Sequence, residues 1–192
     1  MAEPIYKIAI YKSLNLSHLS VAEHEKAREC IFGGLERTGG RTIIRCDSYE
    51  EHWRTFVLQE FPDLESLRQH HANLEEVRRS THYIWESASY LGYKVGGTLK
   101  VSPDKPLIKA YFVKNRIGMS RVPDADQQRL RDPLPEAIIR CRCLEQDWFS
   151  MGVEQYADPE SLHRWNQALA EFQENHGDYW DAMTLLGRER EQ

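Results

Sequence analysis

The groups best suited to acid–base chemistry in this 192-residue chain are a glutamate and two arginines, which lie in two similar segments. Arg45 and Arg140 each lie in an Ile-Ile-Arg-Cys motif, and Glu154 stands where the first segment has Gln59. A buried glutamate can act as a general base because loss of solvation raises its pKa. An arginine beside it can stabilise a developing oxyanion. Glu154 and Arg140 are therefore the first candidates for catalysis.

Further polar and aromatic side chains could complete such a site. His24 is the third candidate for catalysis, as an acid–base group at the mouth of a cavity, although it could simply lie on the surface. Tyrosine and tryptophan suit a cavity wall because they combine an apolar ring with a polar group. The side chains expected to bind substrate are Arg45, Trp53, Thr55, Gln59, Trp148, Ser150, Tyr156, Tyr11 and Tyr111.

The two segments are copies of one another. Residues 43–92 align without a gap on residues 138–187, at an offset of 95, and fifteen of the fifty aligned positions are identical. Chance would give on the order of three at average composition. A repeat of this length predicts two small domains and is far longer than the period of a solenoid.

Alternation of apolar residues and helix-capping signals predict the order of elements in the first copy. That order is βαββαβ, the split ferredoxin-like pattern. The predicted elements are a strand over 5–12, a helix begun by a capping box at Ser20 and Glu23, strands over 42–48 and 52–61, a helix capped by Asp63, and a strand over 90–101.

The second copy departs from the first in two places. Three prolines between Gly118 and Pro135 leave only Asp124–Arg131 free for its first helix, which should therefore be short. The charged tail after Gly187 leaves little room for a last strand.

A four-stranded sheet with two helices has one bare face, which must be buried on something else. Two fused copies can bury these faces on each other. We therefore predict an α+β fold of two tandem ferredoxin-like (βαββαβ) repeats packed sheet to sheet. The expected boundaries are 1–101 for the first repeat, 102–106 for a linker, and 107–192 for the second repeat with its shortened first helix.

Strand alternation assigns two faces to each hairpin. The face of Phe56 and Met151 is apolar in both copies, and we expect it under the helices. The opposite face mixes aromatic and polar residues, which suits a lined cavity. Pairing across the turns places Arg45, opposite Thr55, and Arg140 on this second face.

Two interpretations of the arginines remain open. A buried charge needs a partner, so the arginines could form structural salt bridges with Asp47 and Glu154 where the repeats meet. Alternatively, an arginine binds an anionic or carbonyl-bearing ligand while Glu154 acts as the base. Gly152 in place of Val57 would open space beside Glu154, so one cavity could be functional and the other vestigial.

Composition excludes several classes of partner. A net charge of −5 without a basic block argues against nucleic acid. No long apolar run or signal sequence is present, so we expect a cytoplasmic protein that does not bind membranes. The cysteines, expected as free thiols, have no zinc-ligand spacing, and the histidines form no metal-ligand pattern, so no metal is predicted. A self-sufficient pair of repeats predicts a monomer or a weak homodimer.

The duplicated βαββαβ order resembles the dimeric α+β barrel superfamily, in the version where two ferredoxin-like units are fused in tandem. The resemblance covers nearly the whole chain. Residues 81–85 (Thr-His-Tyr-Ile-Trp) also look similar to the helix-then-aromatic segment of the smaller bacterial darcynin-type proteins. The resemblance implies an intramolecular dimeric α+β barrel, with a ligand bound between sheet and helices or inside the barrel.

The superfamily contains cofactor-free monooxygenases, polyketide cyclases such as olivetolic acid cyclase, isomerases, and haem proteins such as chlorite dismutase. The resemblance therefore implies a small-molecule enzyme that oxygenates, cyclises or isomerises an aromatic or polyketide-like compound without a cofactor. A non-catalytic ligand-binding or protein-interaction module is the alternative, and a haem enzyme is a more distant one. Fold alone does not choose among them.

Overall fold

The computed structural model describes residues 3–12, 20–80, 86–115, 122–131, 135–145, 147–177 and 180–190. The segment 81–85, which carries the resemblance to darcynin-type proteins, lies outside these residues.

The first half of the chain has the predicted βαββαβ order. Its first helix begins with the predicted capping box, since Ser20 accepts a hydrogen bond from Glu23 N and the Glu23 carboxylate accepts one from Ser20 N. The fourth strand ends earlier than predicted, at Gly96. The elements are β1 (Ile5–Tyr11), α1 (Val21–Arg28), a π-helical turn η1 (Glu29–Gly33), α2 (Gly34–Arg37), β2 (Arg41–Ser48), β3 (Thr55–Phe61), α3 (Leu64–Ser80) and β4 (Ser87–Gly96).

The second half repeats this order with one shorter helix, as predicted. The expectation that the tail has no room for a last strand was wrong, because β8 begins before Gly187 and pairs with β5 along most of its length. The elements are β5 (Leu107–Asn115), α4 (Asp124–Arg131), β6 (Glu136–Cys143), β7 (Ser150–Tyr156), α5 (Pro159–His176) and β8 (Trp180–Glu189).

The strands form one closed barrel in the order β1-β3-β2-β8-β5-β7-β6-β4. Each half contributes four neighbouring strands, and the halves join edge to edge at two seams, β2 with β8 and β4 with β6. Both seams are antiparallel. The two sheets thus close into a single barrel in which every described strand is paired on both sides, which removes the liability of an exposed edge.

The barrel interior is a filled hydrophobic core. Its buried cluster draws side chains from both halves, including Ile8, Leu58, Ile108 and Val153. An eight-stranded barrel is just wide enough for its own side chains to fill it. The interior of this barrel is therefore a packed core and not a ligand cavity. Phe56, Leu58, Met151 and Val153 belong to this cluster, so the prediction that their face lies under the helices was wrong.

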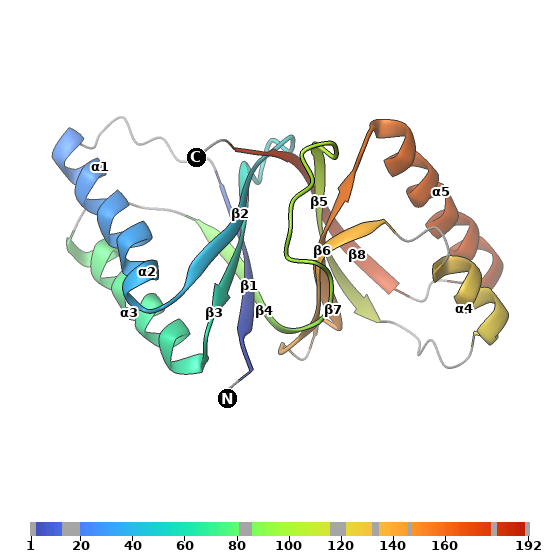
Figure 1. The fold of residues 1–192 in the computed structure, drawn as a ribbon, viewed down its shortest axis with the longest axis horizontal. Helices are drawn as coiled ribbons and strands as arrows, with labels where there is room; N and C mark the ends of the chain where they lie inside the picture. Colours follow the sequence, from blue (N-terminus) through green and yellow to red (C-terminus); the bar gives the residue numbers. More distant parts are fainter. Residues whose placement is uncertain are drawn as a thin grey trace.

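The helices cover the outer faces of the barrel, one set on each half (Figure 1). In the first half, Leu35 and Leu67 from the helices pack on Ile5 and Phe61 from the sheet. In the second half, Phe172 of α5 packs with Val122 and Trp180. The face expected to line a shared cavity therefore lies in two separate sheet–helix layers, on opposite sides of the filled barrel.

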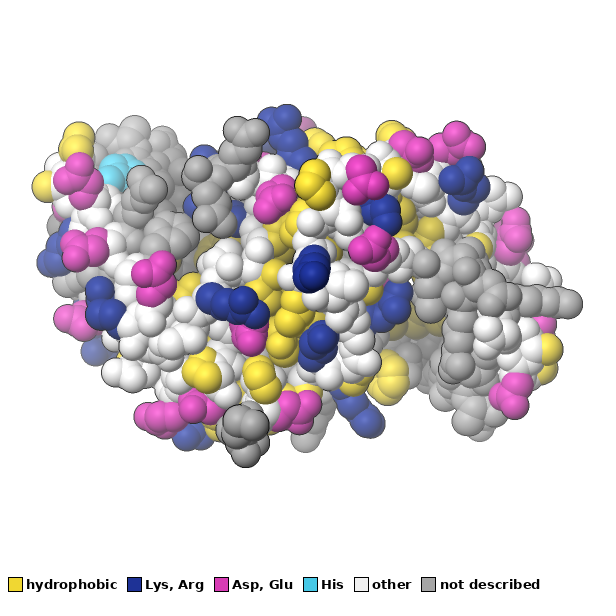
Figure 2. All heavy atoms as spheres, viewed as in Figure 1, with side chains coloured by type: hydrophobic (Ala, Val, Ile, Leu, Met, Phe, Trp, Pro, Cys, Tyr) yellow, Lys and Arg dark blue, Asp and Glu magenta, His cyan; other side chains and the backbone are white. Residues whose placement is uncertain are grey.

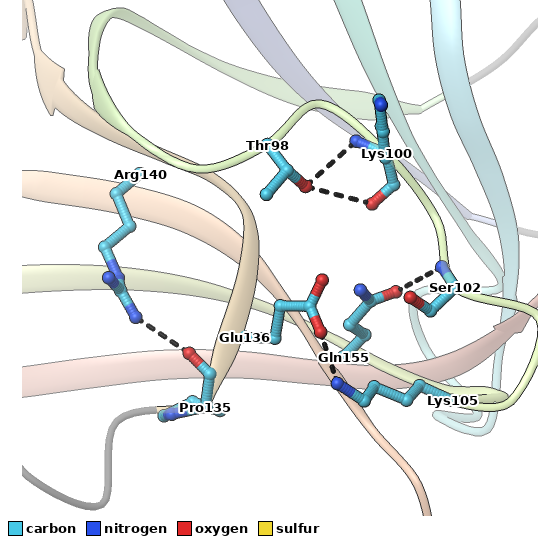
Figure 3. A network of polar contacts seen from close by, with 8 residues as sticks. All are labelled: Thr98, Lys100, Ser102, Lys105, Pro135, Glu136, Arg140 and Gln155. Atoms are coloured by element: carbon cyan, nitrogen blue, oxygen red, sulfur yellow. Dashed lines mark hydrogen bonds and ion pairs between the residues drawn. The ribbon is translucent and has the colours of Figure 1, made fainter.

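The segment between β4 and β5 packs along β6 and β7. Leu99, which has a positive φ of 57°, donates its backbone N–H to Ile138 O at 2.8 Å, and its side chain packs on the barrel core. Ser102 N donates to Gln155 Oε1 at 2.9 Å, and Lys105 pairs with Glu136 (Figure 3). Figure 2 shows hydrophobic side chains in the middle of this face, between the halves, with lysine and arginine side chains beside them.

Each seam has a glycine at a close backbone crossing. A Cβ on Gly92 would lie 2.6 Å from Arg142 O, across the β4–β6 seam, and a Cβ on Gly187 would overlap Asp47 O, across the β2–β8 seam. The two glycines are equivalent positions of the repeat, at the offset of 95. A side chain is therefore excluded at the same place in both seams.

We predict that Gly92→Ala and Gly187→Ala each lower the free energy of unfolding by about 1–3 kcal/mol, because the added methyl group overpacks a backbone crossing. Urea denaturation followed by circular dichroism measures this change. Gly96→Ala is the matched control in β4, since the nearest neighbour of its Cβ would be Arg140 Cβ at 4.0 Å. Equal stability of the three variants would show that the seams do not require glycine.

Candidate functional site

The sheet–helix layer of the second half holds a buried carboxylate. Glu154 lies on β7, where its neighbours Met151 and Val153 face the barrel core, so its own side chain faces α5. It is 4 % exposed. Tyr156, two residues on and on the same face, donates its hydroxyl to Glu154 Oε2 at 2.8 Å. The predicted acid–base residue is thus buried and hydrogen-bonded to one of the predicted substrate-binding residues.

A lysine that the sequence reasoning missed lies beside this carboxylate. Lys109 on β5 is the cross-strand partner of Glu154, and its Nζ lies 4.0 Å from Glu154 Oε2. The same ammonium donates to Asn166 Oδ1 of α5 at 3.3 Å. Lys109 is 6 % exposed, so both members of this ion pair are removed from water.

Arg140 and Tyr111 form the other side of this cluster, which we call the Glu154 cluster (Glu154, Lys109, Tyr156, Tyr111 and Arg140). Arg140 donates to Pro135 O at 2.9 Å (Figure 3) and hydrogen-bonds the Tyr111 side chain. The prediction that Gly152 leaves open space was wrong, because a Cβ there would lie 2.5 Å from the Tyr111 hydroxyl oxygen. The missing side chain is replaced by the tyrosine of the neighbouring strand.

Burial dominates the electrostatics of the Glu154 cluster. It raises the pKa of Glu154 above the usual value for a glutamic acid, although Lys109, Tyr156 and Arg140 each favour the ionised form. Burial also lowers the pKa of Lys109, which Glu154 opposes, and raises the pKa of Tyr156 and Tyr111. The carboxyl therefore exchanges its proton closer to neutrality than a solvated glutamate, as a general acid or base requires.

The first half contains the same lysine without the carboxylate. Lys7 on β1 is the cross-strand partner of Gln59, which stands at the repeat position of Glu154. Lys7 Nζ lies 3.1 Å from His71 Nε2 of α3, and His71 stands at the repeat position of Asn166. The strand-to-helix contact of the lysine is therefore duplicated, whereas among the described residues only the lysine of the second half has a carboxylate beside it.

Most of the other predicted residues lie on the helix-covered face of one half of the chain or of the other. Ser150 lies on the helix-covered face of the second half, and Arg45, Thr55 and Tyr11 lie on that of the first. Arg45 lies opposite Val57 and not, as predicted, opposite Thr55. Because side chains alternate with period two, this shift of two residues leaves Arg45 on the predicted face of the sheet. The predicted set is therefore not one site, since the filled barrel separates the two groups.

The remaining three predicted residues, which belong to neither group, also lie away from Glu154. His24 lies on α1, which covers the first half, at the other end of the molecule (Figure 1). Trp53 and Trp148 pack against the barrel core and not on the predicted face. Each lies two residues before its strand begins, so the alternation of side chains along the strand does not determine which way it points. Lys12 and Lys114 lie over their rings, 5.4 and 4.7 Å from the centroids.

The three cysteines whose side chains the structure describes are unsuited to nucleophilic catalysis. Cys46 and Cys141 are free, as expected, and both face the barrel interior. Burial raises the pKa of Cys141 to about 12, that of Cys143 to about 12, and that of Cys46 further. A thiol with such a pKa stays protonated near neutral pH.

Within the described ranges, no group of three histidine, cysteine, aspartate or glutamate side chains could hold a metal ion. No described helix has the length and apolar character to cross a membrane.

Lys7 should make stability depend on pH. Burial lowers its pKa from 10.5 to about 8, so between these values the unfolded chain binds a proton that the folded chain does not, and the free energy of unfolding should rise with pH. The penalty at pH 7 corresponds to about 3 kcal/mol. We predict that Lys7→Met is more stable than the wild type at pH 7 and that this advantage shrinks toward pH 10.

Urea denaturation of both proteins from pH 7 to pH 10 measures the difference. Lys105→Met is the control, because Lys105 lies in the segment between β4 and β5 and pairs with Glu136. A constant difference between wild type and Lys7→Met across this range would contradict the prediction.

Comparison with known proteins gives matches in structure only. No protein-family model and no curated protein sequence matches the chain. Its structure is similar to a chlorite dismutase variant from Candidatus Nitrospira defluvii, with a TM-score of 0.74, 12 % identity, and coverage of 97 % of this chain and 92 % of that one.

Two further solved structures have the same arrangement. A candidate chlorite dismutase matches with a TM-score of 0.65 and 13 % identity over 99 % of this chain and 96 % of its own. A candidate monooxygenase from Fusobacterium nucleatum matches with a TM-score of 0.58 and 9 % identity over 99 % of this chain and 94 % of its own. With its two βαββαβ halves joined at both seams, the chain has the fold of the dimeric α+β barrel superfamily, in the form that fuses the two units in one polypeptide.

Proposed function

We propose that this protein is a small-molecule enzyme in which Glu154 moves a proton on an aromatic or polyketide-like carbonyl compound, without a tightly bound cofactor. The observation that carries the proposal is the buried carboxyl of Glu154, held by Tyr156 and Lys109 in the sheet–helix layer of the second half. The structural similarity to chlorite dismutases and a candidate monooxygenase supports the enzyme class.

Proton abstraction beside a carbonyl is the step that isomerisation, cyclisation and cofactor-free oxygenation share. The Glu154 carboxylate would take the proton from carbon, and the electron pair would move onto the carbonyl oxygen as an enolate. Arg140, Tyr111 and Lys109 are the donors that could stabilise this oxyanion. Returning the proton to another carbon completes an isomerisation, attack of the enolate on a second carbonyl closes a ring, and reaction with O₂ oxygenates the carbon.

Haem does not fit the residues of this layer. Haem iron needs an axial ligand, most often a histidine. The second half contains only two histidines: His163 is exposed on α5, and His176 lies against Phe172 and 3.5 Å from Asp126. Burial raises the pKa of Tyr111 and Tyr156, which opposes ligation as a phenolate. We therefore assign the chemistry to the side chains of the Glu154 cluster.

One observation favours the alternative, a non-catalytic ligand-binding module. The Arg140 guanidinium already bonds to Pro135 O and to Tyr111, as in the structural interpretation of the duplicated arginines. A binding module would hold the same compounds without exchanging their protons. We also propose that the protein is a monomer or a weak homodimer, because both seams are closed within the chain, and that it is cytoplasmic, because its described cysteines are free.

Hydrogen–deuterium exchange into substrate tests this function directly. Incubation with a panel of aromatic and polyketide-like carbonyl compounds in deuterium oxide should place deuterium on the carbon beside the carbonyl, detected by mass spectrometry. Glu154→Gln should slow this exchange by about 10²–10⁴-fold, the usual contribution of a general base. It should still fold, because the first half already tolerates a lysine opposite a glutamine.

Glu136→Gln is the control, since Glu136 pairs with Lys105 and lies outside the Glu154 cluster. It should exchange at the wild-type rate. Exchange that is equally fast in Glu154→Gln would remove Glu154 from the mechanism. Binding without exchange in the wild type would favour the ligand-binding module.

A further inference from the structure

The layer between the first sheet and α3 contains a buried cation without an anion. Lys7 is 2 % exposed, and the described polar residues beside it include Gln59, which is neutral, and His71. Among the described residues no carboxylate forms an ion pair with Lys7, whereas its repeat counterpart Lys109 lies beside Glu154. An ammonium taken from water without a counter-charge is costly, so this position favours an anion.

Two buried polar atoms beside Lys7 also lack partners. Gln59 Oε1 and His70 Nδ1 have no hydrogen bond, although Gln59 is 6 % exposed and His70 is 2 % exposed. His70 is held in the neutral form, because burial lowers its pKa to about 4. Buried polar groups without partners indicate an occupant, and a bound water could satisfy one of them. A water would leave the charge of Lys7 unbalanced.

The surroundings of these polar groups are apolar and aromatic. Ile5, Phe61 and Leu67 pack in the same layer, and the Phe61 ring lies 5.4 Å from the His70 ring. The helix that covers this side contains the π-helical turn η1, which packs on α3. Such turns inside α-helices are frequent at functional sites.

We propose that the first half carries a second binding site, between its sheet and α3, for a small aromatic acid that bears a hydroxyl group. The carboxylate of the ligand pairs with Lys7, its hydroxyl donates to Gln59 Oε1, and His70 Nδ1 bonds to one of its oxygens. The ring lies among Phe61 and the aliphatic side chains of the layer. This site is separate from Glu154, because the barrel core lies between the two layers.

Calorimetric titration with 4-hydroxybenzoate tests this site. The wild type should bind one equivalent. Gln59→Glu should weaken binding at least tenfold, because the new carboxylate occupies the anion position beside Lys7. That variant should keep its fold, since the second half already has a glutamate opposite its lysine. Benzoate, which lacks the hydroxyl donor, should bind the wild type more weakly than 4-hydroxybenzoate.

Lys109→Met is the matched control, because it removes the equivalent lysine from the other half and should leave the affinity unchanged. Circular dichroism and a thermal melt check that each variant is folded. Three results would overturn the proposal: no binding to the wild type, equal binding to the folded Gln59→Glu variant, or loss of binding in Lys109→Met alone. None of them bears on proton exchange by Glu154, which is measured separately.

Discussion

Closure of the barrel at its two seams is the constraint on which the rest of the structure depends. Each half has a sheet with helices on one side only, so its other side must be covered. Pairing β2 with β8 and β4 with β6 covers both bare faces at once and pairs the edge strands as well. The close crossings at Gly92 and Gly187 let the backbones approach at equivalent places in the two seams.

Closure of the barrel also determines where polar side chains can gather. An eight-stranded barrel is filled by its own side chains. Here those side chains are mostly apolar, and they include Ile8 from the first half and Val153 from the second. Polar groups are therefore placed outside the barrel, under the helices, where each strand still alternates. Each half places a lysine there, and the difference between Gln59 and Glu154 decides whether that lysine has a carboxylate beside it. A single substitution in a duplicated unit thus gives the two layers different electrostatics.

Much of the fold could be predicted from the sequence, because its signals are local. The capping box at Ser20 and the prolines around Asp124–Arg131 predicted helix starts and lengths that the structure confirms. The last strand was missed because its charged end after Gly187 is paired with β2, a contact across the whole chain that no local pattern contains. The barrel followed from the repeat and from the need to bury two bare faces.

The position of the site was harder to predict, for a physical reason. Period-two alternation shows which side chains share a face, but it does not say which face meets the helices. Both sides of these strands are buried, and the more apolar one belongs to the barrel interior. Lys7 and Lys109 were missed because the first strands align at an offset of 102, outside the ungapped repeat. A lysine after an apolar start, two residues into β1 and two residues into β5, was the available signal.

The central claim is that Glu154 is a buried carboxyl whose proton exchange is shifted toward neutrality by its surroundings. Carbon-13 NMR titration of the Glu154 carboxyl in the whole protein, assigned by comparison with Glu154→Gln, measures this most directly. The account predicts a midpoint above 4.5, the value of an unperturbed glutamic acid. A midpoint at or below 4.5 would contradict it, because the carboxylate would then be a structural anion held by Lys109.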